Sequence, residues 1–269
     1  MTHSVTSKDG TRIAYSKKGR GEPLILIDGA FCHRKFGGDT KLPEILQSHF
    51  EVITYDRRGR GESGDTLPYT REKEFEDLQA VTGETGKLPF VYGASSCTAL
   101  ALEAVKYGLR FKKLAVFEAP YITDDSRSAL SENYLSTIQS LIRNKEYNKT
   151  VSYFLGTGIG LPAPLIWFMR LLPAWKKMAE IAPTLEYDTL MLGNFISGKI
   201  LIRQDWENVS FPVLVLSGTK SEKWARNAMI QLARILPNAD HLELKDQNHM
   251  VNPKVLAAYL EEFFLDPYY

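Results

Sequence analysis

The sequence has few cysteines, no excess of charge of one sign and no long uninterrupted apolar run. Its 2 cysteines, Cys32 and Cys97, exclude a disulfide-bonded scaffold and a metal site built from four thiolates. Lysine and arginine number 33 against 32 aspartates and glutamates, and the net charge of +1 argues against binding of nucleic acid. No histidine or cysteine cluster has the spacing of metal ligands, so we expect neither metal nor cofactor.

The most apolar stretch, residues 161–175, is interrupted by Pro162, Pro164, Arg170 and Pro173. A helix that crosses a bilayer needs about 20 nearly uninterrupted apolar residues, so we expect no membrane partner. The polar start MTHSVTSKDG lacks the pattern of a secretory signal, which favours a cytoplasmic location. With 44% hydrophobic and 24% charged residues, the composition is that of an ordinary globular protein. We expect a monomer or homodimer whose ligand is a small molecule.

Predicted strands and predicted helices alternate over most of the chain. After an N-terminal hairpin that turns at Asp9 and Gly10, short apolar runs predict strands at 24–27, 52–55, 90–92, 113–117, 213–216 and 239–244. Helical patterns lie at 41–49, 71–85, 96–107, 224–236 and 253–264. This alternation predicts an α/β fold with a doubly wound, mostly parallel sheet.

Residues 121–205 break the alternation and have a predominantly helical pattern. We predict a core made of residues 1–120 and 206–269, with residues 121–205 forming a helical cap over the sheet. Substrate selectivity would then reside in the cap, where Trp167 and Phe168 are candidate substrate contacts.

The strongest motif is VYGASSC, residues 91–97, at a predicted junction between a strand and a helix. A sharp turn at such a junction lifts the hydroxyl of Ser95 clear of the sheet, and small neighbours let strand and helix pass closely. The amide after the serine points outward at a helix N-terminus, where negative charge is favoured. Ser95 is therefore the candidate nucleophile.

This motif resembles the Gly-x-Ser-x-Gly nucleophile elbow of the α/β-hydrolase family. Further segments resemble family loops in the family's order: LIDGAF at 26–31, YDRRGRGES at 55–63 and QNH at 247–249. The resemblance spans nearly the whole chain and implies the α/β-hydrolase fold, with His249 as the base that activates Ser95. The glycines and arginines of residues 55–63 are expected to shape the loop beneath the site.

The same resemblance implies an oxyanion hole made by the backbone amides of Ala30 and Ser96, with Phe31 beside it as a further substrate contact. Cys97 stands where the family has its second glycine, and we expect it to pack against the helix rather than act as a nucleophile. Asp28 stands where the family usually has histidine. We expect it to pair with a nearby cation, and the candidates are Arg34, Lys35, Arg57 and Arg58.

The acid of the triad has more than one candidate position. The commonest family position follows the strand at 213–216, but residues 218–221 are GTKS there, with Glu222 next. Glu118 ends the strand after the elbow helix, which resembles haloalkane dehalogenases and coelenterazine luciferases. A carboxylate at a buried strand end needs a partner, which His249 would supply, so Glu118 is preferred. The alternatives are Glu222, Asp124 and Asp125.

Together these features predict a serine hydrolase that cleaves a small apolar carboxylic ester, lactone or related carbonyl compound through an acyl-enzyme. Haloalkane dehalogenation is disfavoured because its nucleophile is a carboxylate and position 95 is serine. The alternatives are a haloperoxidase-like enzyme or carbon–carbon bond hydrolase with the same triad, and a ligand-binding or receptor protein that turns over slowly.

Overall fold

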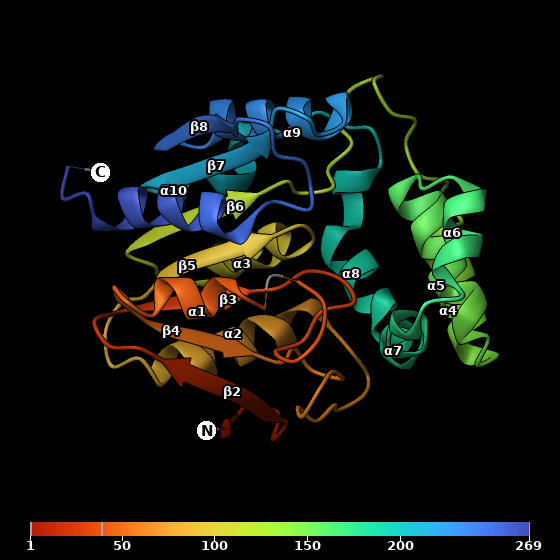
Figure 1. The fold of residues 1–269 in the computed structure, drawn as a ribbon, viewed down its shortest axis with the longest axis horizontal. Helices are drawn as coiled ribbons and strands as arrows, with labels where there is room; N and C mark the ends of the chain where they lie inside the picture. The colour runs from red at the N-terminus through yellow and green to blue at the C-terminus, as the bar shows by residue number, and fades with distance from the viewer. Residues whose placement is uncertain (1, 39, 269) are drawn as a thin grey trace.

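The computed structural model describes residues 2–38 and 40–268, in which one eight-stranded sheet carries helices on both faces (Figure 1). The strands are β1 Thr2–Thr6, β2 Arg12–Lys18, β3 Glu22–Ile27, β4 Phe50–Tyr55, β5 Phe90–Ala94, β6 Lys113–Phe117, β7 Val213–Gly218 and β8 Ala239–Leu244. Their order is β1-β2-β4-β3-β5-β6-β7-β8, and only β2 pairs antiparallel with its neighbours β1 and β4 among these strands. The predicted fold class is confirmed.

Side chains of the central strands point alternately to the two faces of the sheet. Ile25 and Ile27 of β3 pack with α2, α3 and α9, whereas Leu24 and Leu26 pack with α1 and α10. These helices are α1 Leu42–Leu46, α2 Arg71–Gly83, α3 Cys97–Tyr107, α9 Lys223–Ile235 and α10 Pro253–Leu265. Because helices cover both faces, the central strands β3, β5, β6 and β7 are buried along nearly their whole length.

The predicted hairpin forms, whereas the first helix is shorter than its sequence pattern indicates. Between β1 and β2, Gly10 has a φ angle of 86° and the Thr11 N–H donates to Asp9 Oδ1 at 3.0 Å. Helix α1 ends at Leu46 because the chain then packs on Gly19, where a Cβ would lie 2.3 Å from the Gln47 carbonyl oxygen. This close backbone approach cannot be read from helix propensity.

A run of helical segments, here called the inserted helices, lies between β6 and β7. They are α4 Tyr134–Arg143, α5 Tyr147–Tyr153, η1 Phe154–Ile159, α6 Ala163–Met169, α7 Pro173–Ile181, η2 Ala182–Thr184, α8 Leu185–Leu192, η3 Gly193–Ile196 and η4 Arg203–Trp206. Figure 1 shows α4 to α8 beyond one end of the sheet, and they form a separate hydrophobic cluster that Phe31 joins from the loop after β3. None of the helices in the described ranges has the length and apolar character needed to cross a membrane.

Candidate active site

The turn between β5 and α3 holds Ser95 in a backbone conformation that side chains seldom adopt. Its φ angle is 54°; its N–H donates to the Phe117 carbonyl at 2.9 Å, and its carbonyl accepts from the Thr98 N–H at 3.0 Å. Gly93 permits the turn, because a Cβ there would lie 2.9 Å from the Cys97 carbonyl oxygen. This is the local geometry expected of an elbow that presents a nucleophile.

The loop after β3 packs directly against this elbow. A Cβ at Gly29 would lie 2.9 Å from the Cβ of Ser95, so only glycine allows the approach. The next residues, Ala30 and Phe31, line the same cavity as Ser95 and Ser96. The fold therefore brings to one cavity the residues whose amides are predicted to bind an oxyanion.

Glu118 follows β6 directly and meets His249, which lies in the loop between β8 and α10. Glu118 Oε2 is 3.0 Å from His249 Nδ1; Glu118 is 2% exposed, whereas the histidine side chain is 56% exposed. The imidazole ring also stacks on Phe117, with the centroids 6.2 Å apart. A carboxylate at Nδ1 fixes the orientation of the ring and leaves Nε2 for another partner.

Both carboxylate oxygens of Glu118 have partners. Its Oε1 accepts hydrogen bonds from the Gly218 backbone N–H, at 2.8 Å, and from the Ser221 hydroxyl. Such partners are needed because a buried ionised carboxylate without them is strongly unfavourable. Ser221 occupies the position where the resemblance implies an aspartate, and here its hydroxyl donates to the acid that comes from β6.

The alternative acids lie away from His249. Glu222 and Asp125 are exposed, and Asp124 accepts a hydrogen bond from the Asn227 side chain at 2.6 Å. Among the residues that the structure describes, no second carboxylate is paired with the histidine. Of the candidate acids, the structure therefore brings Glu118 into contact with His249.

A cavity of about 510 Å³ joins these groups, and both Ser95 and His249 line it. No hydrogen bond joins Ser95 Oγ to His249 within residues 2–38 and 40–268, and such bonds are often long before a substrate binds. Much of the wall is apolar, and its larger side chains include Phe31, Tyr92, Leu130, Tyr134, Phe154 and Leu192. In the same ranges, no group of histidine, cysteine, aspartate or glutamate side chains could hold a metal ion.

Two aromatic side chains that we expected to contact the substrate lie elsewhere. Trp167 and Phe168 on α6 are 65% and 55% exposed and are not part of the cavity wall, whereas Ile166 faces inward. The sequence of α6, APLIWFM, contains no polar residue. Its pattern therefore does not indicate which face of the helix is buried. Phe31 does line the cavity, and its ring packs edge-on against Phe154, a wall residue that the sequence analysis missed.

Cys97 packs within the elbow. Its thiol is fully buried and donates to the Asp28 carbonyl oxygen at 2.9 Å, and burial raises the pKa of the thiol to about 12. A protonated thiol is a poor nucleophile.

Asp28, which stands where the family usually has histidine, lines the cavity. The cations expected beside it pair with other carboxylates: Arg34 with Asp56 and Glu62, Lys35 with Glu62, Arg57 with Glu74 and Asp188, and Arg58 with Asp77 and Asp9.

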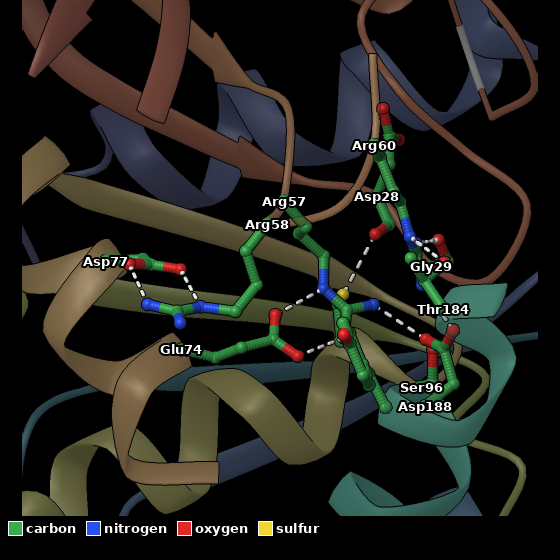
Figure 2. Close-up of polar contacts among 12 residues, drawn as sticks. Asp28, Gly29, Arg57, Arg58, Arg60, Glu74, Asp77, Ser96, Thr184 and Asp188 are labelled. Atoms are coloured by element: carbon green, nitrogen blue, oxygen red, sulfur yellow. Dashed lines mark hydrogen bonds and ion pairs between the residues drawn. The ribbon is translucent and has the colours of Figure 1, made fainter. Parts of the chain in front are cut away.

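Two arginines of the loop after β4, Arg57 and Arg60, converge on Asp188 of α8 (Figure 2). Arg57 binds Glu74 of α2 and Asp188 of α8, with N–O distances of 2.6 Å. Arg60 also binds Asp188, and it donates to the Gly29 carbonyl oxygen at 2.8 Å. The sequence analysis gave this loop a structural role and did not connect it to α8.

Comparison with known proteins identifies the family to which this arrangement belongs. The model of the α/β-hydrolase family matches residues 29–259. The chain belongs to the α/β-hydrolase family. A solved α/β-hydrolase from Sphaerobacter thermophilus is 40% identical to it, with a TM-score of 0.90 over 97% of this chain and 100% of that one.

Two more distant proteins are similar to this α/β-hydrolase, the first in structure and the second in sequence. A bromoperoxidase from Bacillus anthracis is 20% identical, with a TM-score of 0.73 over 99% of this chain and 100% of that one. The (E)-2-((N-methylformamido)methylene)succinate hydrolase of Acinetobacter baylyi is 23% identical over 245 residues, covering 88% of this chain and 87% of its own. One scaffold thus serves several reactions, so the specific activity must be argued from the site.

Proposed function

We propose that this α/β-hydrolase is a serine hydrolase that cleaves a small, apolar carboxylic ester, lactone or related carbonyl compound. Ser95 attacks the carbonyl carbon while His249 takes the hydroxyl proton, and Glu118 orients and stabilises the imidazolium. The observation that carries the proposal is the 3.0 Å contact between Glu118 Oε2 and His249 Nδ1, beside a cavity that Ser95 lines.

The attack places negative charge on the former carbonyl oxygen. The backbone amides of Ala30 and Ser96 are the proposed donors to this oxyanion, and one such donor contributes about 3 kcal/mol to transition-state stabilisation. Collapse of the tetrahedral intermediate expels the alcohol, which takes its proton from His249, and leaves Ser95 acylated. Water then gives a proton to His249 and attacks the acyl group. Collapse of this second intermediate releases the acid, and His249 returns the proton to Ser95 Oγ.

The composition of the cavity wall supports an uncharged, apolar substrate group. Phe154 and Leu192 come from the inserted helices, and Phe31 packs against Phe154 from the core. We therefore propose that residues 121–205 act as a cap that selects the substrate. A volume of about 510 Å³ suits a small organic molecule.

Ser95→Ala tests the mechanism. With nitrophenyl esters of increasing chain length, we expect kcat to fall by about 10⁶-fold, because a triad acts as a unit. A fluorophosphonate probe should label the native protein once, at Ser95, and leave the variant unlabelled. A native protein that binds esters but neither reacts with the probe nor turns over would instead be a binding protein, and the hydrolase proposal would fail.

The same three side chains could also serve perhydrolysis or hydrolysis of a carbon–carbon bond. The resemblance to a bromoperoxidase, at 20% identity, concerns the fold. Peracid formation from an ester with hydrogen peroxide, and cleavage of a β-diketone, should each be measured beside ester hydrolysis. We expect the ester to give the highest kcat/KM.

A further inference from the structure

A buried ion pair joins the loop after β4 to helix α8 of the inserted helices. The side chains of Arg60 and Asp188 are both 0% exposed, and Arg60 Nη2 binds Asp188 Oδ2. Asp188 Oδ1 accepts from Arg57 Nη1 at 2.6 Å. Figure 2 shows these groups converging beside Ser96 and Gly29, two residues next to or within the proposed oxyanion hole.

Arg60 acts on one of the proposed donors through a peptide bond. Its Nη1 donates to the Gly29 carbonyl oxygen at 2.8 Å. That carbonyl and the N–H of Ala30 belong to one planar trans peptide, so they point in opposite directions and cannot rotate independently. Holding the oxygen therefore fixes the direction of the N–H. A cationic donor at the oxygen also polarises the amide and makes its N–H a stronger donor.

Asp188 acts on the other proposed donor. Its Oδ1 accepts a hydrogen bond from the Ser96 hydroxyl at 2.7 Å. Ser96 immediately precedes α3, and its backbone N–H is the amide next to the nucleophile. The bond from its side chain to a fully buried carboxylate restricts the rotation of this residue.

The charges in this cluster balance. Arg57 and Arg60 carry two positive charges, and Asp188 and Glu74 carry two negative charges, all of them buried. Burial opposes ionisation of Asp188, but the neighbouring Arg57 and Arg60 outweigh it and hold the pKa of that carboxyl below its usual range. The carboxylate therefore stays charged and accepts all of its hydrogen bonds.

We propose that Arg60 and Asp188 are positioning residues that each set one of the two backbone amides of the oxyanion hole, and that α8 thereby helps to assemble the site. This inference rests on the proposed function. This role differs from stabilisation of the loop alone, because the pair should stabilise the transition state more than the bound substrate. The expected signature is a lower kcat with little change in KM.

Arg60→Lys is the main test, because lysine keeps the charge but lacks the planar fork that reaches Gly29 and Asp188 together. We expect kcat for a nitrophenyl ester to fall roughly 10- to 100-fold, less than the 10²- to 10³-fold typical of losing an oxyanion donor. The rate of fluorophosphonate labelling at Ser95 should fall in parallel, since that reaction fills the same hole. KM should change by less than about threefold.

Arg58→Lys is the matched control. Arg58 lies in the same loop and its side chain is 0% exposed, but it binds Asp77 and Asp9 rather than groups of the cavity. Its kcat per folded molecule should equal that of the native protein, whatever happens to the melting temperature. If Arg60→Lys lowers kcat no more than this control does, the positioning role is wrong.

Ser96→Ala covers the case in which Arg60→Lys fails to fold. It removes the hydroxyl bound to Asp188 and keeps the ion pair and the backbone amide, and we expect a fall in kcat of about 10-fold. An unchanged kcat would overturn the proposal. Fluorophosphonate labelling of the native protein distinguishes failure of the proposed function from failure of this inference. If Ser95 of the native protein is not labelled, the proposed function is wrong. If it is labelled, the variants test only the roles of Arg60 and Asp188.

Discussion

Arg58 and Arg60 stand two positions apart in one loop, and both side chains are 0% exposed and paired with carboxylates. They lead to different parts of the molecule. Arg58 points to Asp77 of α2 and reaches Asp9 in the β1–β2 turn, whereas Arg60 points the other way, to α8 and the Gly29 carbonyl (Figure 2). Burial and ionic pairing are the same in both, so these properties alone do not indicate function.

The two arginines differ in the groups that their guanidinium groups contact. Replacing a buried ion pair by apolar residues often leaves stability unchanged, whereas removing one partner is strongly unfavourable. The contacts of Arg58 stay within the core and its N-terminal hairpin. The contacts of Arg60 end at the backbone beside Ser95. We therefore expect substitutions of Arg60 and of the residues at the cavity to lower kcat. Substitutions of Arg58 and its partners should lower the free energy of unfolding.

After Ser95→Ala, the largest fall in kcat is expected for a substitution of Glu118. Glu118→Gln keeps the shape of the side chain but removes the charge that stabilises the imidazolium, and kcat should fall by about 10⁴-fold. The matched control is Glu222→Gln, at an exposed acid near the same sheet edge, which should leave kcat unaltered. Equal, small effects of the two substitutions on steady-state rates would refute the assignment of Glu118.

Arg58→Met is expected to have the largest effect on stability. It leaves the carboxylate of Asp77 buried without its cation, and the free energy of unfolding should fall by about 3–5 kcal/mol. Urea unfolding gives this quantity, and ester hydrolysis by the folded fraction gives kcat. A large loss of kcat in a folded Arg58→Met protein would remove the distinction between the two arginines.

The sequence predicted those features that depend on local chemistry. Asp9 and Gly10 predicted the hairpin, and the small residues around Ser95 predicted a tight turn at the end of β5. Glu118 was preferred as the acid for two reasons: its position resembles that of the acid in haloalkane dehalogenases and coelenterazine luciferases, and a carboxylate at the end of an apolar strand needs a partner. In the structure it contacts His249, while Ser221 fills the position that the family resemblance assigned to an aspartate.

The features that the sequence could not predict depend on contacts between distant segments. Arg60 and Asp188 are 128 positions apart in the sequence. The sequence around each of them does not indicate that its charged side chain is buried. A charged residue in a helical pattern is ordinarily assigned to the surface. Trp167 was misplaced for the opposite reason, since a helix apolar on every side does not show which face is buried.

Asp9 makes the Arg58 side of the comparison dependent on pH. Burial disfavours its ionised form, but hydrogen bonds from Arg58 and Thr11 outweigh this and hold the pKa of Asp9 well below its usual range. A carboxyl with a lower pKa in the folded state stabilises the protein fully above its unfolded pKa near 4, and this contribution is lost as the pH falls further.

Asp9→Asn should therefore lower the free energy of unfolding at pH 7 by about 1 kcal/mol, a modest value because the carboxylate is partly exposed. The difference between native and variant should shrink as the pH falls below 4, because the carboxyl then binds a proton in the unfolded state while it is still ionised in the folded state. Urea unfolding at pH 7, 4 and 3 measures it. A difference that stays constant over this range would show that the charge of Asp9 contributes nothing.

An effect of similar, small size but opposite sign is expected at Tyr134, whose buried hydroxyl lacks a hydrogen-bond partner among the described residues. Its hydroxyl makes no hydrogen bond in the described chain, although the residue is 3% exposed and lines the cavity. An unsatisfied buried hydroxyl costs about 1–3 kcal/mol, so Tyr134→Phe should raise the free energy of unfolding by about 1 kcal/mol once the small void is included. The urea midpoint should rise at an unchanged m-value. A lower midpoint would mean that ordered water forms a hydrogen bond with the hydroxyl. Tyr134 would then be a buried polar group with a partner, as Arg58 and Arg60 are.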